Sequence, residues 1–163
     1  MMRVAGTFAA LLTLSACATM ERVLPQDEPR IDATLEAIQN ARVRECPPGR
    51  RLENARIGSD NESRGVTGDE IALVPLASDP QRGVRLRRLT IAPGGAIAWH
   101  AHDVNQGMAL IVSGEMVEFR NSCMDEIRYR AGDVAREDAD TAHGWRNESN
   151  EPAVLLVMQV VAR

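Results

Sequence analysis

The chain has 163 residues, of which 44% are hydrophobic and 26% charged, and this composition fits one globular domain rather than two. Its formal net charge of −4 argues against a general nucleic-acid-binding protein, which would normally present a basic face. All 19 basic residues are arginine, so chemistry that requires a lysine, such as a Schiff base or a P-loop phosphate site, is excluded.

Residues 1–16 predict a secretory signal peptide, because an apolar run from Val4 to Leu14 follows a short start with Arg3 and precedes the small residues Ser15-Ala16. The apolar run is too short for a permanent membrane span. Leu14-Ser15-Ala16-Cys17 resembles the bacterial lipobox, in which the cysteine is acylated and the chain is cut before it. The resemblance implies a mature protein anchored through Cys17. With Ala18 next, we expect an outer-membrane lipoprotein of the bacterial cell envelope that faces the periplasm. The alternative is an ordinary signal peptide with a chance cysteine.

Two further cysteines follow Cys17, and an oxidising envelope permits them to pair. Cys46 precedes the rigid Pro47-Pro48-Gly49 turn, and Cys123 lies in a polar turn, so neither has core-like surroundings. A disulfide between Cys46 and Cys123 and two free thiols both remain open, because the sequence does not show whether the two residues approach each other.

Residues 17–70 are expected to form a tether, a short helix and an arm. Ile31, Leu35 and Ile38 recur at helical spacing, which predicts an amphipathic helix over 32–45 that stops before Pro47. Residues 49–70 are rich in Gly, Asn, Ser and Asp, and we expect a loop there with at most one short strand.

Residues 71–163 are expected to form the main domain, because short apolar runs alternate there with turn residues. Short strands at near-regular spacing predict an all-β sandwich or closed barrel. Ser113-Gly114 predicts a hairpin between the runs on either side of it. The expected strands are Ile71–Leu76, Val84–Ile91, Ala96–His100, Met108–Val112, Met116–Arg120, Glu126–Arg130, Asp133–Arg136, Ala142–Arg146 and Val154–Val161.

The chain has only three histidines: His100, His102 and His143. In His100-Ala101-His102 both imidazoles lie on the same face of a strand, because side chains alternate with a period of two. Facing imidazoles can hold one cation, and three of them make a good site for a borderline metal.

The residues around these histidines resemble the two sequence motifs of the cupin family. In the first motif, Gly94 is followed after five residues by His100-Ala101-His102, then by Gln106 and Gly114. In the second, Gly132 is followed after five residues by Asp138-Ala139-Asp140, then by His143 and Asn147. The resemblance covers roughly residues 71–162. It implies an all-β double-stranded β-helix, the jelly-roll barrel, with His100, His102 and His143 as metal ligands.

The motifs also depart from the family pattern. Gln106 stands where the family has a glutamate as the fourth ligand, or Gly107 does if the motif is aligned backwards from Gly114, so neither alignment supplies a carboxylate there. An amide is a weaker, neutral ligand. We therefore expect Gln106 to be a weak ligand at most, beside an open or water-filled position. Asp103, Asp138 and Asp140 could lend a carboxylate, although a solvated turn explains each of them. Among the neighbouring tryptophans, Trp99 is expected to pack outside the site and Trp145 to face inward. Phe119 and Met158 are expected to be barrel core. A solvated face is expected for three arginines: Arg120, Arg128 and Arg130.

Three classes of function remain open: a metal-dependent enzyme acting on a small molecule, a binding protein without turnover, and a structural lipoprotein. A three-histidine centre without a carboxylate resembles that of the iron thiol dioxygenases and, with copper, of some flavonol-type dioxygenases. An isomerase on the same ligands is equally allowed. For a protein that folds in the envelope, affinity order favours zinc or copper, with iron or manganese as alternatives. The expected partners are a small-molecule ligand and the membrane, through the lipid anchor; cupins often pair, which leaves a homodimer open.

Overall fold

The computed structural model describes residues 35–58 and 61–163, which form a short helix over residues 35–39 and nine strands. None of the helical residues in these ranges forms a segment long and apolar enough to cross a membrane. The predicted signal peptide and Cys17 lie outside the described residues. The strands are β1 Arg42–Arg44, β2 Arg64–Leu76, β3 Asp79–Ala101, β4 Gly107–Ser113, β5 Glu115–Arg120, β6 Ile127–Arg130, β7 Asp133–Glu137, β8 Ala142–Arg146 and β9 Ala153–Ala162.

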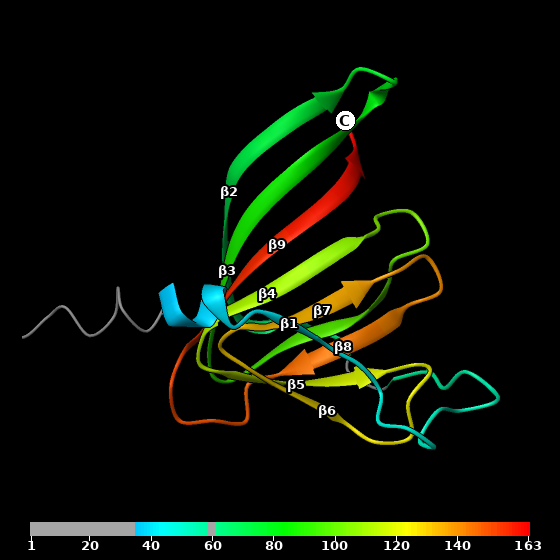
Figure 1. The fold of residues 1–163 in the computed structure, drawn as a ribbon, viewed down its shortest axis with the longest axis vertical. Coiled ribbons are helices and arrows are strands. Elements are labelled where there is room, and N and C mark those ends of the chain that lie inside the picture. Colours follow the sequence, from blue (N-terminus) through cyan, green and yellow to red (C-terminus); the bar gives the residue numbers. More distant parts are fainter. Residues whose placement is uncertain (1–34, 59–60) are drawn as a thin grey trace, which may run out of the picture.

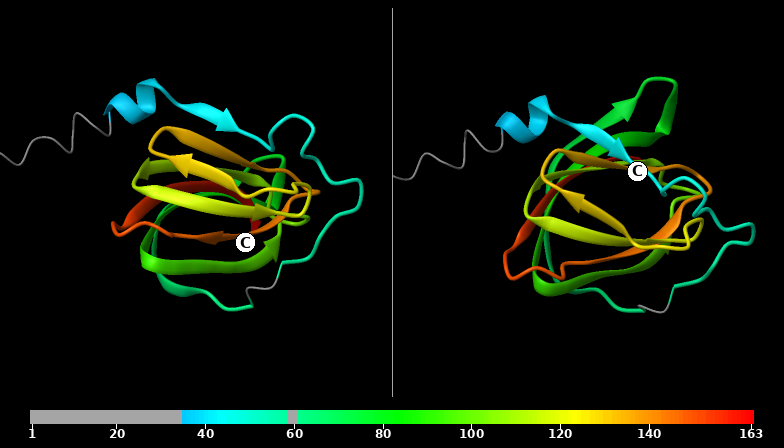
Figure 2. Two further views of the ribbon diagram at one scale, coloured as in Figure 1. Left: turned by 90° about the horizontal axis from the view of Figure 1, so that it is seen from below. Right: turned by 60° about the horizontal axis from the view of Figure 1, so that its bottom comes forward.

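The strands form one sheet that curls into a nearly closed barrel (Figure 2). Their order is β1-β7-β4-β9-β3-β8-β5-β6, with β2 added on β3. Strands β6 and β7 lie near opposite ends of this order, yet a tight turn at Gly132 joins them, so the two ends of the sheet meet. Gly132 has a φ of +88°, a conformation that favours glycine. The fold confirms the predicted all-β jelly-roll architecture with a short N-terminal helix.

Strand β3 connects the two parts of the barrel (Figure 1). Two of the expected strands, Val84–Ile91 and Ala96–His100, are one continuous strand that bends between them. Before the bend β3 pairs with β9, and after it β3 pairs with β8. Gly94, with a φ of +71°, permits the bend, and its amide donates to the Asn147 carbonyl at 2.9 Å. The bend therefore carries the end of β3, with His100, across to β8.

The hairpin prediction at Ser113-Gly114 is wrong. Strand β4 pairs with β7 and β9, whereas β5 pairs with β6 and β8. Gly114 has a φ of +77°, and a Cβ there would lie 2.7 Å from the Pro152 carbonyl oxygen. The glycine thus permits a sharp corner at which the chain crosses from one part of the barrel to the other, and it does not form a turn between paired strands.

The helix predicted over 32–45 extends too far at its C-terminal end. In the described residues the helix ends at residue 39, and Arg42–Arg44 form β1, which runs parallel to β7. The Nε atoms of Arg42 and Arg44 each lie 3.0 Å from Oδ1 of buried Asp133. These ion pairs and the strand hydrogen bonds hold the segment extended, a tertiary effect that outweighs its helical pattern. Strand β2 likewise begins at Arg64, earlier than the first expected strand.

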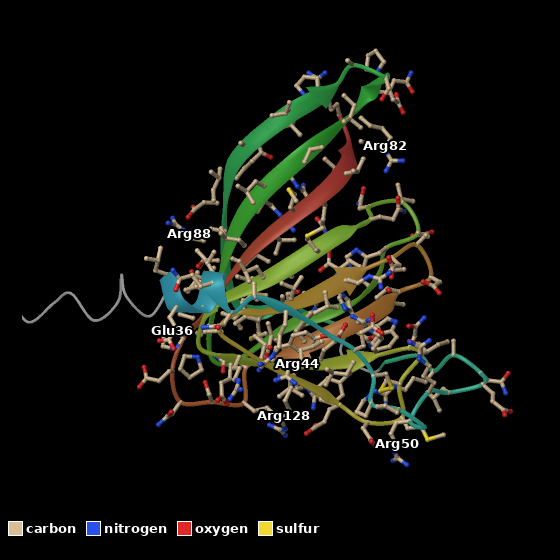
Figure 3. All side chains as sticks on the ribbon, viewed as in Figure 1. Glu36, Arg44, Arg50, Arg82, Arg88 and Arg128 are labelled. Atoms are coloured by element: carbon tan, nitrogen blue, oxygen red, sulfur yellow. A yellow bond between two sulfur atoms is a disulfide. The ribbon has the colours of Figure 1, made fainter. Side chains whose placement is uncertain are left out.

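The arm that follows β1 is attached to the turn between β5 and β6. Cys46 and Cys123 form a disulfide. Backbone hydrogen bonds support the same contact: the Leu52 amide donates to Ser122 at 3.0 Å, and the Met124 amide donates to Arg50 at 2.8 Å. The side chain of Arg50, labelled in Figure 3, donates two hydrogen bonds to Asp125, at 2.6 and 2.7 Å.

Alternation along the strands decides which side chains enter the core. Ile91, Ile111, Leu155, Tyr129 and Trp145 are fully buried inside the barrel. The expectation that Phe119 and Met158 are core is wrong: Met158 is 41% exposed and Phe119 is half-buried, because their strand neighbours take the inward positions. Arg120 also departs from prediction. It is buried, whereas Arg128, labelled in Figure 3, and Arg130 are exposed.

Candidate metal centre

The three histidines converge from two paired strands. His100 lies near the end of β3, directly opposite His143 of β8, and His102 follows β3 by one residue. One ring nitrogen of each residue lies within 4.8 Å of the other two. The Nε2 atoms of His102 and His143 are 2.9 Å apart. His102 and His143 are buried, and His100 is partly exposed, so the cluster reaches solvent on the side of His100.

The opposite nitrogen of each ring faces a hydrogen-bond acceptor. Nδ1 of His100 lies 2.8 Å from the Ala98 carbonyl, and Nδ1 of His102 lies 2.8 Å from the Asn105 carbonyl. Nδ1 of His143 lies 2.5 Å from Oε1 of Glu118. Because a carbonyl or carboxylate oxygen can only accept, these contacts assign the proton of each neutral ring to Nδ1. All three Nε2 atoms are then unprotonated and able to bind a cation, although Nε2 of His143 also accepts a long hydrogen bond from the indole of Trp145 at 3.3 Å.

Glu118 of β5 fixes the His143 ring. Its carboxylate is fully buried and accepts hydrogen bonds from Nε of Arg120 at 2.9 Å and from the Tyr129 hydroxyl at 2.6 Å. Burial by itself would raise the pKa of Glu118, but the contacts with His143, Arg120 and Tyr129 outweigh it and lower the pKa. An ionised, fully hydrogen-bonded carboxylate behind a histidine is the arrangement that orients metal ligands in proteins.

A second buried carboxylate, Glu137 of β7, faces the cluster. Its Oε1 lies 4.0 Å from Nε2 of His143, and its Oε2 lies 3.5 Å from Nδ1 of His102. The side-chain amide of Gln159 donates to Oε2 at 2.9 Å. Burial raises the pKa of Glu137, and the hydrogen bond from Gln159 acts in the opposite direction.

Burial keeps the imidazoles in their neutral form. It lowers the pKa of His143 to about 4, although Glu118 acts in the opposite direction. Burial is also the main cause that lowers the pKa values of His100 and His102. Neutral imidazole is the form that binds a metal, so the donor set fits a divalent cation at neutral pH.

Several side chains that the sequence offered as possible ligands make contacts outside the histidine cluster. The side-chain nitrogen of Gln106 donates to the carbonyls of His102 and Asp103, both at 2.8 Å, and so holds its own loop. Asp103, Asp138 and Asp140 are exposed, and Asp138 pairs with Arg136. The indole of Trp145 is buried with Nε1 3.3 Å from Nε2 of His143, as the inward orientation predicted. Trp99 packs on the outer side against Gly58.

The sequence interpretation missed both buried carboxylates. Strand alternation could have found them, because Glu118 shares a face with Met116, and Glu137 shares a face with Ala135. A charged residue at an inward position of a core strand requires a partner, and such positions are candidates for a site.

Comparison with known proteins gives a family match over the same region. Residues 87–159 match the model of the cupin domain. No curated protein matches the chain significantly.

Three solved structures illustrate the likeness in fold. The TT1209 protein from Thermus thermophilus is 30% identical, with a TM-score of 0.43 over 54% of this chain and 80% of that one. A Cupin 2 conserved barrel domain protein from Salinispora arenicola is 19% identical, with a TM-score of 0.47 over 71% of this chain and 87% of that one. The Cnp3 cupin domain from Schizosaccharomyces pombe is 11% identical, with a TM-score of 0.48 over 60% of this chain and 66% of that one.

The matched region contains both motifs and all three clustered histidines, and it forms most of the barrel. On this evidence the region from residue 87 to residue 159 is a cupin domain.

Proposed function

We propose that this protein is a metal-dependent cupin of the bacterial cell envelope that holds a divalent cation through His100, His102 and His143 and acts on a small molecule. The observation that carries the proposal is the convergence of one ring nitrogen from each histidine within 4.8 Å of the other two, while each Nδ1 atom faces an acceptor. Zinc and copper are the favoured ions, because imidazole donors suit both and both stand high in the affinity order. Iron or manganese would bind the same donors more weakly.

A cation bound there would offer open positions to a small molecule and polarise it. The chain's own residues would orient the ligands and restrict water: Glu118 fixes the His143 ring, and the buried indole of Trp145 lies edge-on to that ring with centroids 5.3 Å apart. A dioxygenase or an isomerase fits such a centre, since the fold does not by itself select a reaction.

A second candidate function is ligand binding without turnover. It is favoured by the near-complete burial of His102 (1% exposed) and His143 (0% exposed), which leaves His100 as the one histidine of the cluster that is in contact with solvent. Oxygen consumption or product formation by the metal-loaded protein, compared with chelator-treated protein, separates the two functions. Turnover that depends on the metal supports the enzyme, and its absence across a panel of small acids, thiols and phenols supports the binding protein.

Metal titration tests the proposed centre. Protein extracted from the envelope fraction is treated with chelator and titrated with zinc and with copper(II) at pH 7.5. We expect one equivalent to bind to the wild type, and His102→Ala to weaken affinity by about 100-fold or more, because a direct ligand counts for at least as much as the residues that orient it. Gln106→Ala is the matched control and should bind like the wild type, since the Gln106 amide holds its own loop. Equal affinity in the wild type and His102→Ala, or no binding by either, contradicts the proposal.

A further inference from the structure

Gln106 stands in the first motif where the family has a glutamate, so a fourth protein ligand of the proposed metal centre would have to come from another part of the chain. The Gln106 amide is committed to two backbone carbonyls of its own loop. A carboxylate that does lie near Nε2 of His143 comes from a different strand: Oε1 of Glu137, on β7, is 4.0 Å from that nitrogen, while its Oε2 is 3.5 Å from Nδ1 of His102. The inference below rests on the proposed metal centre and concerns how that centre is completed.

Glu137 ends a row of residues that crosses four adjacent strands. Arg85 of β3 pairs with Gln159 of β9, Gln159 pairs with Gly107 of β4, and Gly107 pairs with Glu137. A Cβ at Gly107 would lie 2.6 Å from Cγ of Gln159 and 2.1 Å from the Met158 carbonyl oxygen. The missing side chain at Gly107 therefore lets Gln159 reach across β4 to the carboxylate of Glu137.

The side-chain amide of Gln159 has only one orientation that satisfies both of its neighbours in this row. Oε1 of Gln159 accepts a hydrogen bond from Arg85 at 3.1 Å, and Nε2 of Gln159 donates to Oε2 of Glu137 at 2.9 Å. A guanidinium offers only donors and an ionised carboxylate offers only acceptors, so a flipped amide would lose both bonds. Because Gln159 engages Oε2, the other oxygen, Oε1, is the one aimed at Nε2 of His143.

The spacing of these atoms matches a coordination shell after small movements. Two ligand atoms that each lie about 2.1 Å from a metal are about 3.0 to 3.4 Å apart in octahedral or tetrahedral geometry. Oε1 of Glu137 is 4.0 Å from Nε2 of His143, and the Nε2 atoms of His102 and His143 are 2.9 Å apart. For tetrahedral geometry a shift of roughly half an ångström in each of these two pairs meets the requirement. The ring nitrogens of the three histidines lie within 4.8 Å of one another, so a bound cation would also draw His100 closer to the other two.

We propose that Glu137 is the fourth protein ligand of the metal, delivered from β7 by the Arg85–Gln159 row instead of from the loop after His102. The centre is then three imidazoles and one carboxylate, and a divalent cation with these ligands carries a net charge of +1 rather than +2. The carboxylate binds through Oε1 while Oε2 stays with Gln159. Glu118 remains a positioning residue, because its carboxylate contacts the far nitrogen of His143.

Cobalt(II) tests this assignment, because its visible spectrum reports the ligands themselves. Chelator-treated wild type, Glu137→Gln and Asp138→Asn are each titrated with cobalt(II), and zinc affinity is measured by chelator competition. Asp138→Asn is the matched control, since it removes a neighbouring carboxylate that is exposed and pairs with Arg136. We expect Glu137→Gln to weaken zinc binding by about 100-fold and to change the position or intensity of the cobalt bands. Asp138→Asn should keep both the affinity and the bands.

The outcomes separate this inference from the proposed function. If the wild type binds no metal, the three-histidine centre itself is wrong. If the wild type binds metal and Glu137→Gln gives the same cobalt bands, Glu137 is not a ligand, whatever its effect on affinity. Should Glu137→Gln fail to fold, the zinc-loaded wild type decides: a crystal structure with Oε1 of Glu137 about 2.0 to 2.2 Å from zinc supports the assignment, and a longer distance with a water in that position overturns it.

Discussion

The position of one proton on each histidine ring determines what this centre can bind. Two backbone carbonyls and the Glu118 carboxylate hold the three Nδ1 atoms, so each imidazole presents Nε2. Backbone acceptors cannot be changed by a side-chain substitution, which makes the orientation of His100 and His102 robust. His143 depends on a single side chain, and its neutral state depends on burial.

The free energy of unfolding of the metal-free protein should depend on pH through His143. The pKa of His143 is lowered to about 4 in the folded protein, whereas a histidine in the unfolded chain titrates near ~6.5. The unfolded state therefore binds more protons between these values, and the free energy of unfolding of the metal-free protein should fall as the pH decreases from about 6.5 to about 4. His100 and His102, whose pKa values are also lowered, contribute in the same direction.

Urea unfolding of the metal-free protein at pH 7.5, 6.0 and 4.5 measures this effect. His143→Asn removes one of the three histidines whose pKa is lowered, so its free energy of unfolding should depend less steeply on pH than that of the wild type. A wild-type protein that is equally stable at the three pH values, or a variant with the same slope, would show that the buried histidine does not control stability in this range.

Among the elements, β3 and the arm show how pieces distant in sequence are brought together. The bend after Ile91 lets one strand pair with β9 and then with β8, and this second pairing sets His100 opposite His143. The arm after β1 is attached differently, because its described residues contact the barrel through an isolated bridge between Arg51 and Cys123, backbone hydrogen bonds and the Arg50–Asp125 pair. Because these contacts are fewer than the hydrogen bonds of a paired strand, the attachment of the arm depends strongly on the disulfide between Cys46 and Cys123.

The second prediction is therefore that the disulfide stabilises the arm and the barrel together. Cys46 and Cys123 are separated by 77 residues, and closing a loop of that length contributes about 4 kcal/mol to the free energy of unfolding on the chain-entropy model. Thiol counting on denatured protein from oxidising compartments should find no free thiol from these two residues. Reduction should lower the midpoint of urea unfolding, and Cys46→Ser should lower it by a similar amount. Two free thiols, or a midpoint unaffected by reduction, would contradict the pairing.

At the scale of the whole molecule, the barrel is proposed to be tethered to the membrane ahead of its first described residue. The prediction rests on Leu14-Ser15-Ala16-Cys17 after the apolar run. Cys17→Ser should release the protein from the membrane fraction or block its maturation, because the thiol is the site of acylation. Fractionation of cells and immunoblotting measure both effects, with Cys46→Ser as a control that keeps the anchor. A Cys17→Ser protein that is correctly cleaved and still membrane-bound would disprove the lipoprotein prediction.

The fold was predictable to a large extent, because strand signals are local. The runs from Met108 to Val161 fall within one or two residues of the strands β4 to β9. Failures occurred where a partner far along the chain decides the outcome. Ion pairs with Asp133 hold Arg42–Arg44 in an extended strand. Strand β4 pairs with β7, and β5 pairs with β8, so the Ser113-Gly114 turn connects two strands that do not pair with each other.

The three histidines could be identified as the core of the candidate site without any structure, since their spacing follows a motif and a strand alternates every two residues. The carboxylates that accompany them could be identified in the folded barrel alone. Glu118 and Glu137 come from β5 and β7, and their approach to His143 depends on a sheet that curls back on itself. Gln106 occupied the expected position in the sequence, but its amide bonds to the loop carbonyls. Spacing along one strand is a local property, whereas the carboxylate that faces a histidine is set by which strands the barrel brings together.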